Sequence, residues 1–438
     1  MKRGLPVLGR LLEFRRDPLA FLQAAAAEDG EVARFRLGAQ NIVLLSHPDD
    51  IRDLLVTHNT RFVKNRMLHR ARILLGEGLL TSEEPRHTRQ RKLVQPAFYR
   101  ERLPAYADAM VQQTERVAAH WQPGQALQLN EEMMRLTLGI VADTLFGAQV
   151  DETAVTVGAA LTEILEMFDL LMLPMSEYVV RLPLLPVARR FRFARRQLDD
   201  IVYGIITRRR QSGHDPGDLL AMLLAARDED GQPMTDTEVR DEALTLFLAG
   251  HETTATALTW TWYLLSQHPN VEARLHAEID QVLAGRRPAF DDFQRLPYIE
   301  MVLAESMRLY PPAWAIGRRA VQPHTVRGVQ FPVDTIFIAS PYVTHRNPAL
   351  WPDPEKFDPE RFRPAAREAR HRFAYFPFGG GPRVCIGERF AWLEGVLVLA
   401  ALARHWRFRV ESSCHPVPLP LITLRQKDGL RATLASRT

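Results

Sequence analysis

Residues 376–387 read Phe-Pro-Phe-Gly-Gly-Gly-Pro-Arg-Val-Cys-Ile-Gly, and a strong helical pattern follows from Glu388 to His405. The three consecutive glycines allow the backbone to approach another group closely and to adopt positive φ angles. Cys385 stands directly before the expected helix, where free N–H groups and the helix dipole stabilise a thiolate. This stretch therefore predicts a cysteine held in a tight loop at a helix N-terminus.

The residues of this loop leave three interpretations open. A thiolate held in this way can be an axial ligand to a haem iron. A lone cysteine is more commonly a small, inert core residue. A glycine-rich turn before a helix can also cradle a phosphate group, although no Gly-Lys-Ser/Thr follows here.

A second unusual stretch interrupts the long apolar helix expected over Asp241–Gln267 with Ala-Gly-His-Glu-Thr-Thr at 249–254. A glycine inside a helix costs about 1 kcal/mol relative to alanine, and buried Glu and Thr side chains need polar partners. The pattern favours a helix that faces a cavity and uses these side chains there. A zinc-binding His-Glu-x-x-His helix is excluded because position 255 is Ala255. An exposed polar turn on a surface helix is the remaining alternative.

The cysteine loop resembles the cysteine-ligand signature of the cytochrome P450 family, Phe-x-x-Gly-x-Arg-x-Cys-x-Gly, with every fixed position filled. The resemblance implies a haem b cofactor with Cys385 as the iron ligand. It places Phe378 beside the sulfur and pairs Arg383 with a haem propionate, a role that suits a guanidinium fork.

The interrupted helix is similar to the oxygen-binding motif of the same family, Ala/Gly-Gly-x-Glu/Asp-Thr. By this resemblance Glu252 and Thr253 relay protons during oxygen activation, and Gly250 makes room for dioxygen above the haem. The helix would then be the long central helix of the fold.

Further residues match supporting positions of the family. Glu305 and Arg308 form a Glu-x-x-Arg pair, and Pro-Glu-Arg-Phe at 359–362 supplies Arg361 as a third member that braces the cysteine loop. The resemblance places three more residues near the haem propionates: His87, Arg91 and Arg318. Many relatives carry tryptophan where His87 stands, and Arg318 has Arg319 beside it.

The composition, 46% hydrophobic and 25% charged, is that of a globular protein. We expect a single domain over residues 1–438, mainly α with a minor β region and without a fused reductase. Helices are expected over Pro18–Ala27, Leu103–Trp121, Glu131–Phe146, Arg192–Arg210, Val271–Leu283 and Tyr298–Leu309. Strands are expected over Val32–Leu37, Asn41–Leu45, Thr335–Ala339 and Leu419–Leu424, and an irregular meander over Thr344–Pro364.

Charge and cysteine content limit the partners and the compartment. The net charge of +4 and the lack of a binding motif argue against nucleic acid. Two cysteines, no signal-peptide pattern and no run of about 20 apolar residues predict a cytoplasmic protein. The family resemblance implies ferredoxin or flavodoxin, with its reductase, as electron donor. Three basic residues, Arg86, Arg89 and Lys92, are expected to face that donor.

The substrate is predicted from an apolar stretch and a closer resemblance. The family's lid falls on Phe168–Val187, which leads into the basic cluster Arg189–Arg196 and suggests a lipophilic substrate taken from a membrane surface. Strings such as Arg-Leu-Tyr-Pro-Pro-Ala-Trp at 308–314 resemble bacterial carotenoid-ring hydroxylases, so that Trp314 and Leu421–Leu424 would line the pocket. Carotenoid or terpenoid hydroxylation is therefore expected; a fatty-acid hydroxylase and a non-catalytic haem sensor stay as alternatives.

Overall fold

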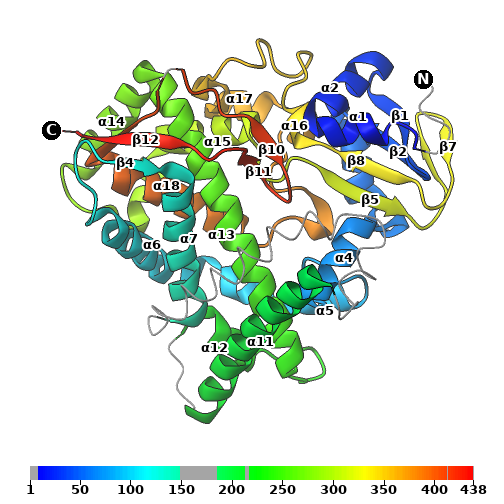
Figure 1. The fold of residues 1–438 in the computed structure, drawn as a ribbon, viewed down its shortest axis with the longest axis horizontal. Helices are drawn as coiled ribbons and strands as arrows, with labels where there is room; N and C mark the ends of the chain where they lie inside the picture. Colours follow the sequence, from blue (N-terminus) through cyan, green and yellow to red (C-terminus); the bar gives the residue numbers. More distant parts are fainter. Residues whose placement is uncertain (1–7, 148–184, 213–216, 412, 438) are drawn as a thin grey trace.

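One long helix, α13 (Asp236–Gln267), crosses the middle of the molecule and organises the elements around it (Figure 1). The computed structural model describes residues 8–147, 185–212, 217–411 and 413–437. The helix begins with a capping box, in which Thr235 and Glu238 each bind the other's backbone N–H. It ends before Pro269, which opens the next helix, α14 (Pro269–Leu283). The helix predicted over Asp241–Gln267 is confirmed and starts at Asp236.

Helices pack around α13 on the side of the molecule that carries the C-terminus. The main core joins α6 (Leu103–Ala118), α7 (Leu129–Phe146) and α18 (Glu388–Ala403) to α13 through buried aliphatic side chains. The other helices are α1 (Leu11–Arg16), α2 (Pro18–Asp29), α3 (Pro48–Arg52), α4 (Arg66–Leu75), α5 (Arg86–Val94), α11 (Pro186–Ser212), α12 (Leu219–Ala225), α15 (Pro297–Leu309), α16 (Pro341–Thr344) and α17 (Pro364–Ala369).

A five-stranded sheet lies at the other end of the molecule, beside the N-terminal helices (Figure 1). Its strand order is β1 (Val32–Leu37), β2 (Gln40–Leu45), β8 (Ile336–Ala339), β5 (Ile316–Ala320), β3 (Phe62–Lys64). Only the β2–β8 pair is parallel within this sheet. A three-stranded sheet joins β4 (Ala126–Gln128), β12 (Arg431–Ser436) and β9 (Trp406–Arg409), and a hairpin joins β6 (His324–Val326) to β7 (Val329–Phe331).

One predicted strand is wrong. Leu419–Leu424 forms a hairpin of two short strands, β10 (Pro418–Pro420) and β11 (Leu424–Gln426), with a turn at 421–423 between them. Trp314 and Trp260 donate their indole N–H groups to the carbonyls of Leu421 and Leu424, at 2.9 and 2.7 Å. The bond from Trp260 ties the hairpin to α13, and the bond from Trp314 ties its turn to the segment before β5.

The irregular meander predicted over Thr344–Pro364 is confirmed apart from a short 3₁₀ turn at Pro359–Phe362. Within the part of the chain that the structure describes, no helix has the length and apolarity needed to cross a membrane. The predicted lid, Phe168–Val187, lies almost entirely outside the described residues.

Candidate active site

The cysteine loop is tightly built against its neighbours. Gly379 and Gly381 have φ angles of 73° and 71°, and a Cβ at position 381 would collide with the carbonyl oxygen of Leu55. The Cys385 N–H donates to the carbonyl of Phe378 at 3.0 Å, which closes the loop. The Phe378 ring lies 5.7 Å from the ring of Trp392, on the helix that follows. The predicted loop before a helix is therefore present, and glycine is required at 381.

Cys385 is accessible to solvent. The protein atoms packed near its sulfur raise the pKa of the thiol, while the N–H of Gly387 acts in the opposite direction. The sequence predicted a thiolate stabilised by the helix N-terminus. Burial acts against that effect, and a metal ion bound to the sulfur would favour the thiolate.

The middle of α13 presents a small accessible face. Ala249, Gly250 and Thr253 are partly or fully accessible, whereas the neighbouring residues of this helix are buried. The Thr253 hydroxyl donates to the carbonyl of Ala249 at 2.6 Å, one turn earlier. A Cβ at Gly250 would lie 3.1 Å from a methyl group of Val141 on α7, so this glycine also permits close packing of the two helices.

Glu252 points away from this face toward the C-terminal hairpin. Its carboxylate is buried and accepts hydrogen bonds from Thr423 Oγ1 at 2.7 Å and from Arg425 Nε at 2.8 Å. Arg425 Nη2 lies 2.8 Å from the same oxygen. Adjacent helix residues project about 100° apart, so Glu252 and Thr253 do not face one space. The hairpin ties the predicted proton-relay acid to β11.

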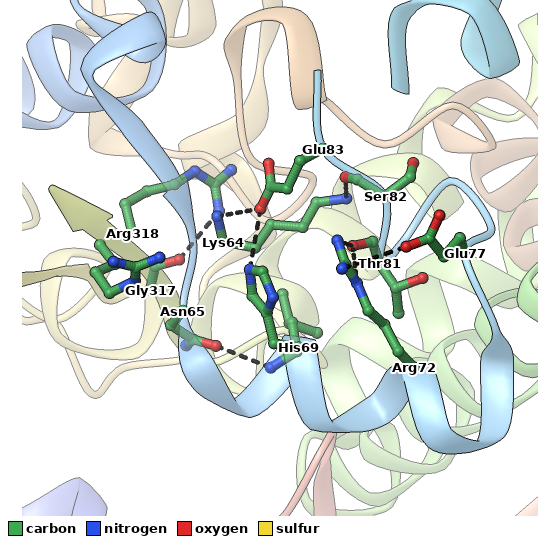
Figure 2. Close-up of polar contacts among 12 residues, drawn as sticks. Lys64, Asn65, His69, Arg72, Glu77, Thr81, Ser82, Glu83, Gly317 and Arg318 are labelled. Carbon is green, nitrogen blue, oxygen red and sulfur yellow. Dashed lines mark hydrogen bonds and ion pairs between the residues drawn. The ribbon is translucent and has the colours of Figure 1, made fainter. Parts of the chain in front are cut away.

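A cluster of cations lies between β3, β5 and the cysteine loop (Figure 2). The Lys64 ammonium is buried and donates to the carbonyls of Leu79 and Ser82, at 2.9 and 2.7 Å. Desolvation, helped by Arg383, lowers the pKa of Lys64 to about 7 and that of Arg318 to about 10. Glu83 is the carboxylate in this cluster: it pairs with Arg383 and accepts the backbone N–H of Lys64 at 2.7 Å.

Such an excess of desolvated positive charge fits a group with two carboxylates. Three cations, Lys64, Arg318 and Arg383, share one acid, and Arg383 is two residues from the accessible Cys385. The residues present therefore match a haem with its propionates in the cation cluster and its iron at the cysteine. Lys64 and Glu83 were not predicted from the sequence, because nothing in the residues around them distinguishes these charged side chains from exposed ones.

His87 and Arg91, the two residues of α5 expected near the haem propionates, have different surroundings. His87 is buried, its Nδ1 lies 3.2 Å from Glu84 Oε1, and burial with Lys64 and Arg383 nearby lowers its pKa to about 4. Arg91 donates to the carbonyl of Val384 at 2.8 Å, directly before the cysteine. In this structure Arg91 holds the cysteine loop itself rather than joining the cation cluster.

The expected bracing network is present. Glu305 and Arg308 are fully buried and form two hydrogen bonds of 2.7 and 2.8 Å, and Arg361 lies 3.5 Å from the same carboxylate. Arg308 also donates to the carbonyl of His345 at 2.8 Å. The His345 Nε2 atom accepts the N–H of Phe376 at 3.0 Å, at the start of the cysteine loop. The network therefore connects the meander to the loop through His345.

The expected basic docking surface on α5 needs correction. Arg86 pairs with Glu77, Arg89 with Asp228 and Glu238, and Lys92 with Glu229. These acidic partners neutralise the three cations, so α5 does not present a free positive cluster. Two of the partners come from the segment 228–229, far away in sequence.

The comparisons with known proteins agree with this site. The family model described as Cytochrome P450 matches residues 1–430. Cyclooctatin synthase of Streptomyces melanosporofaciens is 38% identical over 432 residues, covering 98% of this chain and 92% of the relative. Pentalenene oxygenase of Streptomyces avermitilis is 37% identical over 438 residues, covering 99% and 96%.

Among solved structures, the retinoic-acid-bound cyanobacterial CYP120A1 superposes with a TM-score of 0.90 at 30% identity, covering 99% of this chain and 98% of that one. The matches extend over nearly the whole chain and include the cysteine loop, the central helix and the bracing network. The chain belongs to the cytochrome P450 family and is a haem-thiolate monooxygenase.

Proposed function

We propose that this monooxygenase inserts one oxygen atom from O₂ into a ring C–H bond of a lipophilic terpenoid, a class that includes carotenoids. The relatives support this class, since their names refer to cyclooctatin, pentalenene and cyclooctat-9-en-7-ol. The observation that carries the proposal is the position of the apolar turn at 421–423. Thr423 of this turn donates a hydrogen bond to Glu252, which ties the turn to the part of α13 that also carries Thr253.

The protein's contribution follows from the geometry. When bound, the haem b supplies the oxygen chemistry, and a thiolate ligand favours O–O bond cleavage. Cys385 would hold the iron, with Phe378 beside the sulfur, and Lys64, Arg318, Arg383 and His87 would surround the propionates. Arg91 would keep the loop carbonyl next to the ligand in place.

The residues of α13 and the hairpin would orient the substrate and manage protons. Thr253 presents a hydroxyl at the accessible face. Glu252 has to leave Arg425 and Thr423, or pass a proton through Thr423, before it can serve that face. The 2.9 Å hydrogen bond from Trp314 to the carbonyl of Leu421 would hold the apolar turn at 421–423 in place beside the substrate.

We further propose a cytoplasmic location and a separate ferredoxin or flavodoxin as electron donor. The two cysteines are unpaired, which suits a reducing compartment.

Optical titration of the purified ferric holoenzyme tests the substrate class. The ligands are β-carotene, a cyclic sesquiterpene and a long-chain fatty acid, each added separately. A shift of the Soret band to shorter wavelength with either terpenoid, followed by a hydroxylated product in mass spectrometry, is the expected result. A shift with the fatty acid alone would replace the proposal with fatty-acid hydroxylation. A shift without reduction or product would favour a haem sensor.

A further inference from the structure

A cluster of two histidines and one aspartate lies at the sheet end of the molecule, outside the haem site. Asp53 begins the π-helical turn η1 (Asp53–Thr57), His58 caps its end, and His324 begins β6. Each residue offers one ligand atom, and the three atoms lie within 4.8 Å of one another. Segments nearly 270 residues apart in sequence thus bring nitrogen and carboxylate donors together.

His324 is the least satisfied member of this cluster. Its side chain is 2% exposed, and neither ring nitrogen makes a hydrogen bond of acceptable geometry with any of the residues that the structure describes. Its Nε2 lies only 3.1 Å from Asp53 Oδ2, so the carboxylate is near but out of line for an N–H donor. A buried imidazole whose ring nitrogens lack well-aligned hydrogen bonds is costly, so His324 would gain from a further polar partner or an ion.

The surroundings hold the His324 ring rigidly. Phe62 and Phe337 pack edge-on against it, with ring centroids at 4.9 and 5.5 Å. Asp53 and His58 are each about one-third exposed, and their side chains meet at 2.6 Å between Oδ1 and Nδ1. The cluster therefore has one fixed buried ligand and two that water can reach, so an ion could enter and keep a water ligand.

We propose that Asp53, His58 and His324 form a binding site for Zn²⁺ or a similar late divalent transition metal. Two imidazoles and one carboxylate with an open position are a common ligand set for this class of ion. Zinc bonds of about 2.0–2.2 Å in a tetrahedral site keep the ligand atoms about 3.4 Å apart. Separations of up to 4.8 Å would therefore shorten by at most about 1.5 Å, and the 2.6 Å contact between Asp53 and His58 would open. The ion would take the place of the proton between Asp53 and His58 and give His324 a partner.

The site also has a structural link to the cysteine loop. The turn η1 carries Leu55, whose carbonyl oxygen abuts Gly381 so closely that no Cβ fits there. A metal at Asp53 and His58 would join η1 to the β6–β7 hairpin and stiffen the surface that supports the loop. Metal binding is therefore expected to raise the thermal stability of the holoenzyme.

The test is equilibrium dialysis of chelator-treated holoenzyme against micromolar Zn²⁺, with zinc and haem iron counted separately by mass spectrometry. We expect one zinc per chain in the wild type and at least a tenfold weaker affinity in His58→Asn and His324→Asn. The matched control is His371→Asn, because His371 is also partly exposed and lies 3.3 Å from an aspartate, Asp49. This variant should bind zinc like the wild type.

Thermal unfolding of the same proteins gives a second readout. Added Zn²⁺ should raise the melting temperature of the wild type and of His371→Asn but not that of His58→Asn, which changes a partly exposed residue and should fold. The proposal is overturned if the wild type binds no zinc at these concentrations. It is equally overturned if His58→Asn binds zinc as tightly as the control.

Discussion

At the scale of single residues, the interior of this enzyme holds acids that burial keeps protonated. Glu394 on α18 is fully buried, and desolvation raises its pKa to about 8, with the Thr254 hydroxyl opposing the shift. Glu242 on α13 behaves in the same way, with a pKa raised to about 8, although it accepts the N–H of Leu79 at 3.0 Å. These side chains bring no negative charge into the core at neutral pH.

Glu394→Gln should therefore change how stability depends on pH. The folded state keeps the Glu394 proton up to about pH 8, whereas the unfolded chain loses it near the ordinary glutamate pKa of 4.5. The folded state binds more protons between these values, so the contribution of Glu394 to stability falls as pH rises. Urea unfolding should show the wild type losing about 3 kcal/mol relative to Glu394→Gln between pH 5 and pH 8. Parallel curves for the two proteins would contradict the burial argument.

The buried Glu305 carboxylate depends on Arg308 as its bidentate partner. Removing Arg308 leaves Glu305 without this partner in a fully buried position. Arg308→Met should lower the free energy of unfolding by about 3–5 kcal/mol. The control is Arg52→Met, whose 3.3 Å pair with Asp49 is exposed on both sides and should change little. Chemical denaturation of both variants measures the two losses of unfolding free energy. Equal losses would contradict the larger stabilisation expected from the buried pair.

At the scale of elements, the C-terminal hairpin and the central helix act as one unit. The hairpin supplies the carbonyls that anchor Trp314 and Trp260, and it also supplies both partners of Glu252. A substrate that displaces the turn at 421–423 would therefore act on the hydrogen bonds that hold Glu252. Substrate contact and release of the acid are linked through a single hairpin.

A double-mutant cycle measures the strength of this link. Arg425→Met leaves the buried Glu252 carboxylate without its cation, and should cost about 2 kcal/mol of unfolding free energy because Arg425 is partly exposed. Glu252→Gln, alone and combined with Arg425→Met, completes the cycle. We expect a coupling energy above about 1 kcal/mol. Additive losses in urea unfolding would mean that the two side chains do not depend on each other.

Elements that depend on the pattern of their own residues could be predicted from the sequence. Elements that depend on contacts with residues far away in the chain could not. The apolar run and the capping residues of α13 are local, and so is the proline-rich meander. The split of Leu419–Leu424 into two strands depends on Trp260 and Trp314, which are 164 and 107 positions from their acceptors. The charges of Arg89 and Lys92 on α5 looked free because their acidic partners lie 137 to 149 residues away.

At the scale of the whole molecule, the residues that fit a haem are brought together from the sheet and the cysteine loop. The sheet contributes Lys64 from β3 and Arg318 from β5, while the cysteine loop contributes Arg383 beside α18. These elements are far apart in sequence, and no local pattern predicts that their charges converge. The cysteine-loop signature pointed to Arg383 and a separate family resemblance to Arg318, whereas Lys64 and Glu83 are recognised only from their positions beside Arg318 in the folded chain (Figure 2).

The retention of haem should therefore depend on a cation from the sheet, and adjacent arginines on β5 provide a matched pair. Arg318 is strongly desolvated and lies in the cation cluster, whereas Arg319 forms a 2.7 Å pair with the exposed Asp334. Arg318→Met removes a charge that would face a propionate, so the rate of haem transfer to an excess of apomyoglobin should rise at least tenfold. Arg319→Met should transfer haem at the wild-type rate. Equal rates for all three proteins would remove Arg318 from the haem site and leave Lys64 and Arg383 as the cations that hold the propionates.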